Sequence, residues 1–159
     1  MFSYKLSLLL PVLFVACQQP PTTPTVDMAA EDAAIRSVID QMYSNIEAQD
    51  FDALATICTD DWVFFTDAGS IWTLQELASF FAENITEHTI EISNIELVVS
   101  DDATVSWVSM DEDTEYLFRG EPMSQHALFT GGLVKEADGW KVGHLHRSVR
   151  IEQAVEEEM

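Results

Sequence analysis

The chain has 159 residues, enough for one ordinary domain, and its 47% hydrophobic and 10% aromatic content is sufficient for a buried core. Acidic residues outnumber Lys and Arg by 28 to 7, which gives a formal net charge of −21. A surface this negative repels phosphate backbones and anionic lipid headgroups, so the charge argues against nucleic-acid binding and favours a soluble, exposed domain.

The first 16 residues have the organisation of a signal peptide. Lys5 precedes an uncharged run over 6–15, LSLLLPVLFV. As a helix this run would rise about 15 Å, half of a bilayer core, so it suits a cleaved signal better than a permanent span. Cleavage after Ala16 removes one base, Lys5, and leaves 28 acids against 6 bases, a net charge of −22.

Residues 14–17, FVAC, resemble the bacterial lipobox, with Phe14 in place of the usual Leu. The resemblance implies that Cys17 is acylated, and Gln18 in place of Asp implies the outer membrane. The alternative is ordinary cleavage after Ala16, which leaves a free thiol. Residues 17–27 are then the lipidated Cys and a Pro/Thr tether, QQPPTTPTV over 18–26, with no apolar periodicity.

A long helix is predicted over 28–49, with Asp27 as its N-cap, because apolar residues recur there at helical spacing. This stripe consists of Ile35, Val38, Ile39, Met42, Tyr43 and Ile46. A short helix from Phe51 follows, in which Cys58 shares the apolar face and is interpreted as a small buried hydrophobe.

The run WVFFT over 62–66 predicts a strand that ends at a turn, DAG, over 67–69. The segment TLQE over 73–76 fits a capping box and predicts a helix over 74–84. From His88 onward apolar residues alternate as in strands, and the parity changes near Asn94, which predicts a β-bulge.

A turn at 100–102 leads into a strand through Trp107, and DEDTE over 111–115 is interpreted as a solvated acidic loop. Strands are predicted over 116–119, 123–135 and 140–150, with a hairpin turn at 136–139 and an acidic tail over 151–159. Early helices and late strands favour an α+β domain over 28–150.

The last strand is the stretch richest in functional side chains. In a regular strand, one face is formed by Trp140, Val142, His144, His146 and Ser148. Lys141 and Arg147 point the other way and are costlier to bury, so the first face is predicted to line a pocket with an apolar half and a polar half.

This strand, with its DG turn, WKV, H-x-H and Ser148, resembles the SnoaL-like branch of the nuclear transport factor 2-like superfamily. The long first helix, DFD over 50–52, DDW over 60–62 and Gly69 support the resemblance over residues 28–150. It implies a cone-shaped α+β barrel, in which a strongly bent, mostly antiparallel sheet wraps around about three N-terminal helices and encloses a deep cavity. Members include isomerases, polyketide cyclases, dehydratases and non-catalytic binding or assembly domains, and many are dimers through the outer sheet face.

The residues expected to line the cavity are Tyr43, Trp62, Phe64, Trp72, Trp107, Trp140, Val142 and Ser148. Ketosteroid-isomerase-like members pair an interior carboxylate with a Tyr or protonated Asp. Tyr43 could supply the hydroxyl, but the sequence offers no matching carboxylate other than Asp67, whose turn position suggests a solvated cap.

Three interpretations of His144 and His146 are open: general acid or base, metal ligands, or hydrogen-bonded core residues. His126 would share the face of His144 if the 136–139 hairpin had a three-residue loop. A loop of two or four residues would bring Phe129 and Leu133 there instead, which the apolar odd positions favour. No metal or other cofactor is predicted.

We expect an outer-membrane lipoprotein, facing the periplasm or the cell surface, whose domain binds a small, largely apolar molecule. The alternatives are an isomerase, cyclase or lyase that uses His144 or His146, and a non-catalytic, dimerising module of envelope assembly. A homodimer is expected, with the lipid on Cys17 as the sole membrane contact.

Overall fold

The computed structural model describes residues 26–149. The predicted signal peptide, Cys17, the tether before residue 26 and the acidic tail lie outside the described residues. Within them, no helix combines the length and apolar character needed to cross a bilayer.

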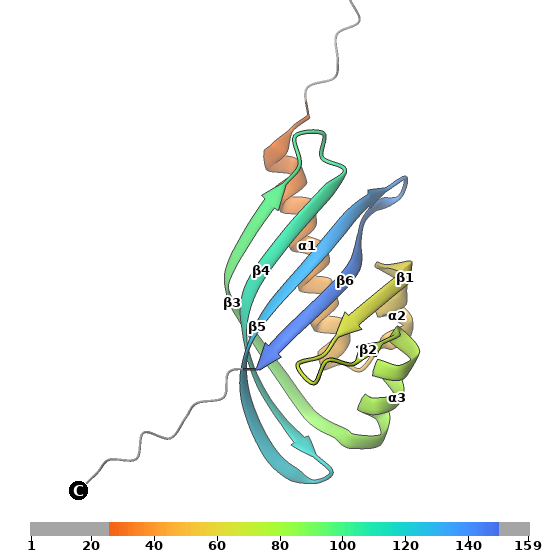
Figure 1. Cartoon of the computed structure of the whole chain (residues 1–159), viewed down its shortest axis with the longest axis vertical. Coiled ribbons are helices and arrows are strands. Elements are labelled where there is room, and N and C mark those ends of the chain that lie inside the picture. The colour runs from red at the N-terminus through yellow and green to blue at the C-terminus, as the bar shows by residue number, and fades with distance from the viewer. Residues whose placement is uncertain (1–25, 150–159) are drawn as a thin grey trace, which may run out of the picture.

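One curled, six-stranded sheet forms the body of the fold, in the order β2-β1-β6-β5-β4-β3. Only the β1–β6 pair is parallel. The sheet is curled but not closed, with α1 along one face and the opposite face free of helices (Figure 1). The elements are α1 (Met28–Glu47), α2 (Phe51–Thr56), β1 (Cys58–Phe65), β2 (Ile71–Trp72), α3 (Leu74–Asn84), β3 (Ile85–Val99), β4 (Val105–Phe118), β5 (Glu121–Glu136) and β6 (Gly139–Val149). The predicted α+β cone is confirmed.

The helices form for the local reasons that their sequences indicate. The Asp27 carboxylate caps α1 by accepting from the Ala30 amide at 3.2 Å. Thr73 and Glu76 form the reciprocal capping box of α3, in which the Glu76 carboxylate accepts from the Thr73 amide at 2.7 Å. The predicted stripe of α1 packs into the core through Ile35, Ile39, Met42 and Tyr43, which are buried.

Three sequence predictions about segments that form strands have different outcomes. The bulge near Asn94 is confirmed, because the β3–β4 register shifts between Ser93 and Glu96. The acidic loop is wrong: residues 111–115 are the middle of β4, paired on both sides. Cys58 is buried as expected, but it begins β1 instead of lying on a helix.

A second bulge, in β6, decides which side chains face the helices. The β5–β6 hairpin has a two-residue loop, since Glu136 pairs with Gly139, and Leu133 pairs with Val142. Gly132 then pairs with His144, so Gly143 is an extra residue in β6. After an extra residue the side-chain alternation is out of step, and every later residue faces the side opposite to the predicted one.

Candidate functional site

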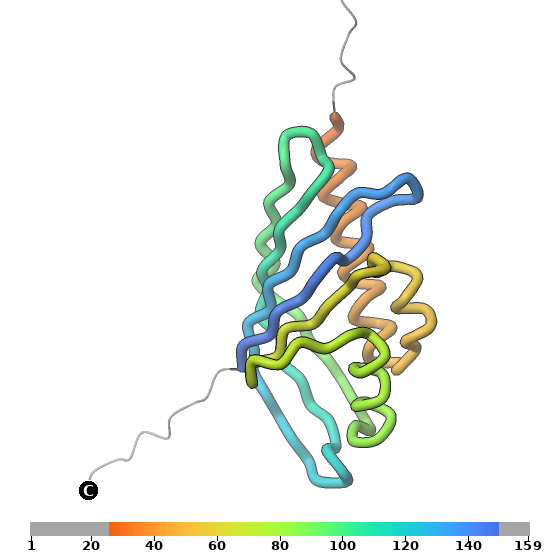
Figure 2. Tube along the Cα trace, turned by 45° about the vertical axis from the view of Figure 1, so that its right-hand side comes forward, coloured from red at the N-terminus to blue at the C-terminus, as the bar shows by residue number. Residues whose placement is uncertain are grey.

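A cavity of about 360 Å³ lies between the helix-covered face of the sheet and α3. Its volume falls within the range of small-molecule sites. The β4–β5 hairpin and α3 meet at this end of the molecule, as the trace in Figure 2 shows. The residues that line it are Ile46, Phe64, Thr66, Asp67, Ala68, Ser70, Trp72, Leu77, Phe80, Phe81, Ile85, His88, Ile90, Glu112, Thr114, Tyr116, Gln125, Phe129, Leu145 and Arg147.

Aromatic rings form much of the cavity wall. Phe64 on β1 stacks against Phe129 on β5 with ring centroids 6.2 Å apart, and it meets Trp72 edge-on at 6.3 Å. Phe80 of α3 packs on Trp72 at 4.9 Å. Because four different elements contribute these rings, the apolar wall exists only once the sheet has curled onto α3.

A buried ion pair forms the polar end of the cavity. Glu112 on β4 is 3% exposed, and its Oε1 accepts from Arg147 Nε on β6 at 3.3 Å. Burial raises the pKa of the Glu112 carboxyl, while the Arg147 charge and hydrogen bond oppose that shift. This carboxylate was missed in the sequence because the acidic run around it is typical of solvated segments.

Tyr43 on α1 lies close to this ion pair, on the core side of the cavity wall. Its hydroxyl is buried and has no hydrogen-bond partner among the described residues, and its ring packs edge-on against Phe129 at 6.2 Å. Burial raises the tyrosine pKa well above its ordinary value, and the nearby Glu112 carboxylate adds to that shift. Tyr43 is therefore a neutral hydroxyl beside a buried carboxylate, although it does not line the open space.

His88 lines the cavity from β3, where Glu87 has a positive φ of 52° and the β3–β4 register shifts between Thr86 and Thr89. Its Nδ1 is buried without a hydrogen-bond partner among residues 26–149. Burial lowers the imidazole pKa, which favours the neutral ring, and the charge of Glu47 opposes this. No sequence signal identified His88, because its inward direction results from the irregular backbone at the start of β3.

The predicted inward direction of His144, His146 and Ser148 is wrong. The extra residue Gly143 turns them to the outer face of the sheet, and brings Leu145 and Arg147 to the cavity instead. On the outer face His144 contacts the rings of Phe65 and Trp107, at centroid distances of 6.3 and 6.0 Å.

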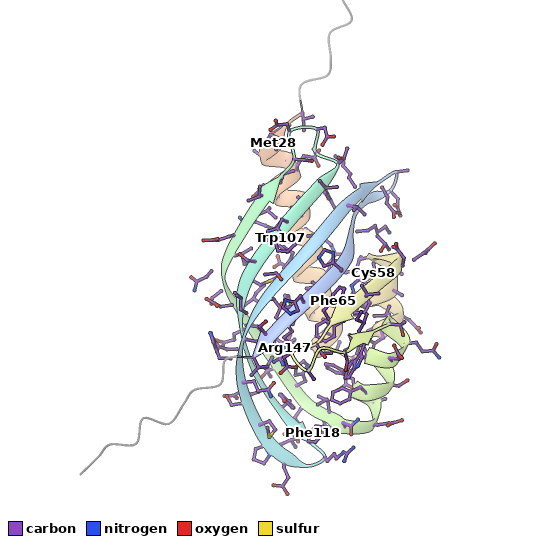
Figure 3. All side chains as sticks on the ribbon, viewed as in Figure 1. Met28, Cys58, Phe65, Trp107, Phe118 and Arg147 are labelled. Atoms are coloured by element: carbon purple, nitrogen blue, oxygen red, sulfur yellow. The ribbon has the colours of Figure 1, made fainter. Side chains whose placement is uncertain are left out.

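The other predicted lining residues divide into three groups. Phe64 and Trp72 line the cavity. Trp62, Trp140 and Val142 are buried in the core away from it, and the Trp140 indole donates to Glu31 on α1 at 2.8 Å. Trp107, labelled in Figure 3, is 49% exposed on the outer face, where its ring contacts that of His144.

His126 also lies on the outer face, together with His144. A two-residue hairpin loop by itself would place these two side chains on opposite faces. The extra residue Gly143 reverses the direction of His144 and so brings both to the same face. The His126 Nδ1 is 2.7 Å from Asp113 Oδ1. Within residues 26–149, no group of three or more His, Cys, Asp or Glu side chains is placed to hold a metal ion.

A second, more open groove of about 730 Å³ lies where β1 and β6 separate. The β1–β6 register shifts between Cys58 and Val63, which opens the space. Its walls are mainly polar and carry Asp60, Asp61 and Lys141, so it lacks the apolar lining typical of small-molecule sites. The cavity at Glu112 and Arg147, with its largely apolar wall, is the better candidate site.

The model of the SnoaL-like domain matches residues 35–152. The chain belongs to the SnoaL-like family. A comparison with curated proteins gives no match.

Solved structures share the fold of this SnoaL-like chain at low identity. An NTF2-like protein from Cytophaga hutchinsonii is 13% identical, with a TM-score of 0.68, over 75% of this chain and 98% of that one. A putative scytalone dehydratase from Novosphingobium aromaticivorans is 14% identical, with a TM-score of 0.68, over 78% and 87%. A hexachlorocyclohexane dehydrochlorinase from Novosphingobium barchaimii is 18% identical, with a TM-score of 0.70, over 79% and 90%. At these identities the likeness concerns the fold alone.

Proposed function

We propose that this SnoaL-like domain binds a small, largely apolar molecule in its 360 Å³ cavity. The observation that carries the proposal is the combination of an aromatic wall with a single buried polar end, Glu112 and Arg147. An apolar ligand would gain from leaving water, and the ion pair would fix its orientation.

Calorimetric titration with trans-cinnamamide and trans-cinnamate tests this proposal. Ala68 lines the rim of the cavity and is exposed, so Ala68→Trp is expected to block entry without disturbing the core. Ala137→Trp, in the exposed β5–β6 turn, is the matched control and should bind both probes as the natural chain does. Absence of binding for both probes, or equal binding by the Ala68→Trp variant, would contradict a ligand site in this cavity.

Proton-transfer catalysis of the isomerase, cyclase or lyase type is the second candidate. It is favoured by two groups able to exchange protons, Glu112 and His88, which line the same cavity from adjacent strands. Because His144 and His146 face outward, the candidates for acid–base catalysis in this cavity are Glu112 and His88 instead.

Solvent exchange gives a test of catalysis that needs no identified substrate. Small aromatic ketones incubated with the protein in deuterium oxide should lose α-protons faster than in buffer, as followed by NMR. The enhancement should vanish in Glu112→Gln or His88→Gln and persist in His144→Ala. An enhancement insensitive to both cavity substitutions would remove the case for catalysis at this site.

We further propose that the chain is an exported lipoprotein, held in the outer membrane by Cys17, and that it forms a homodimer, as a ligand-binding or envelope-assembly module would. The helix-free sheet face supports the dimer, because it exposes large apolar side chains on neighbouring strands. These are Phe65, Val98, Val105, Trp107 and Leu128, with exposures of 36% to 67%. Exposed apolar patches of this kind mark interaction surfaces.

A further inference from the structure

The guanidinium of Arg147 is positioned in the cavity but not saturated. Nη2 donates to Gln125 Oε1 at 3.0 Å and to Thr114 Oγ1 at 3.4 Å, and Nε donates to Glu112 at 3.3 Å. Nη1 has no hydrogen-bond partner among residues 26–149. An arginine has five N–H donors, and Nε and Nη2 already use three of them, so the two N–H groups of Nη1 remain for a ligand carboxylate.

Charge balance restricts how such a ligand can bind. With a carboxylate from the ligand, two carboxylates would share one guanidinium in a buried space, and two like charges held that closely do not both stay ionised. Glu112 is the group placed to take up the proton, because it is almost fully buried and its bonded partner Arg147 would be shared with the ligand. Burial already raises its pKa.

The other ionisable groups near Glu112 are few. They are Tyr43 on α1, Asp67 in the loop after β1, His88 on β3, Asp113 and Tyr116 on β4, and Arg147 on β6. Tyr43 and Tyr116 have raised pKa values and stay neutral at physiological pH. His88 and Asp67 also line the cavity and could compete for the proton, so the test must separate them from Glu112.

The volume and the aromatic lining of the cavity indicate the size and the ring character of the ligand's apolar part. Its 360 Å³ corresponds to about a dozen water volumes, hence to a molecule of about a dozen non-hydrogen atoms. Phe64, Phe129 and Trp72 line the space and contact one another, an aromatic environment in which a flat ring gains additional packing energy.

We propose that the cavity takes an aromatic carboxylic acid, which binds as the carboxylate at Arg147 while Glu112 takes up one proton. This rests on the proposed binding function and names its ligand class. No covalent step is involved: a proton moves from solvent to Glu112 as the ligand enters, and returns when it leaves.

Trans-cinnamate and its neutral isostere trans-cinnamamide test the proposal by calorimetry with the full chain, in two buffers of different ionisation enthalpy. Cinnamate should bind with uptake of about one proton, and its affinity should fall about tenfold per unit of pH wherever Glu112 is ionised in the free protein and protonated in the complex. Cinnamamide should bind more weakly at the acid end, and without proton uptake. Glu112→Gln should bind cinnamate with no pH slope, and Glu115→Gln, on the exposed side of the same strand, should retain the slope.

Arg147→Gln should lose the preference for cinnamate over cinnamamide, and a cooperative urea unfolding transition shows whether this variant is folded. Equal binding of acid and amide by the natural chain at acid pH overturns the inference. So does proton uptake that persists in Glu112→Gln, because the proton then goes to another cavity group such as His88 or Asp67. Failure of both probes to bind would instead overturn the proposed function, so the two failures are distinct.

Discussion

The imidazole of His144 lies against Gly132 on the neighbouring strand, so closely that a Cβ on Gly132 would sit 2.6 Å from His144 Cε1. The two residues are register partners across β5 and β6. Only a residue without a side chain leaves room for the ring, which lies between Phe65 and Trp107 on the outer face. The glycine therefore supports an outward His144, the reverse of the direction predicted from strand alternation.

Gly132→Ala is accordingly expected to lower the free energy of unfolding by about 1–3 kcal/mol, the usual cost of overpacking. In a His144→Ala background, Gly132→Ala should lower the free energy of unfolding much less, because the imidazole ring that the new methyl group would contact is absent. Urea unfolding of the four chains of this cycle measures the difference. Gly143→Ala is the control, since its Cβ would find its nearest neighbour at 3.5 Å; an equal cost in both backgrounds would contradict the contact.

Glu112→Gln should change how stability depends on pH. Because burial raises the pKa of Glu112 in the folded state, the natural chain holds this proton more tightly when folded. Its stability relative to Glu112→Gln should be fully present below the ordinary glutamate pKa and should fall as pH rises through the raised value. Urea titrations at several acidic to neutral pH values measure it, and a difference that does not vary with pH would contradict a shifted Glu112.

Cys58 should be inert in the folded protein. Its thiol is buried, and burial raises its pKa to about 12. Alkylation by iodoacetamide at mildly alkaline pH should therefore proceed only after denaturation, since the thiolate is the reactive form. Mass spectrometry of a Cys17→Ser chain, in which Cys58 is the sole cysteine, follows the reaction; rapid modification without denaturant would show an open site.

Cys17→Ser should release the protein from membranes. If Cys17 carries acyl chains, each buried methylene contributes about 0.8 kcal/mol to anchoring, and a serine cannot be acylated through a thiol in this way. Fractionation of membranes and soluble extract with an antibody to the domain makes the comparison. The same partition for both chains would exclude lipid anchoring at this residue.

Trp107→Glu should keep the domain monomeric if the outer sheet face is the dimer interface. Trp107 is 49% exposed on that face (Figure 3), and a buried unpaired carboxylate strongly opposes association. Met28→Glu changes an apolar residue that is 40% exposed at the start of α1, away from the outer sheet face, and should leave the dimer intact. Sedimentation over a range of concentrations distinguishes the outcomes; a natural chain that stays monomeric would end the proposal.

The helices and turns could be predicted well, because their signals are local. The Asp27 cap, the Thr73–Glu76 capping box and the parity change at Asn94 each act within a few residues of chain. The middle of β4 could not be predicted in this way. Asp111 and Asp113 face outward while Glu112 faces inward, and three acidic residues in succession conceal that alternation.

The candidate site shows the same limit. Phe64 and Trp72 were expected at the cavity, but Glu112, His88 and Arg147 were not. Arg147 was assigned to the outer face on the correct premise that a lone buried cation is costly. Its partner Glu112 lies 35 residues earlier, and only their proximity in the folded sheet removes that cost.

By itself, the sequence determined the family, the α+β class and the positions of the helices, since caps, periodicity and turn residues act over short stretches of chain. Tertiary structure alone decided the inward face of β6. Gly143 becomes an extra residue only when Gly132 pairs with His144 and Leu133 with Val142. A register between strands is a property of both strands, and a shift of one residue exchanges the two faces, so Arg147 reaches the cavity and His144 does not.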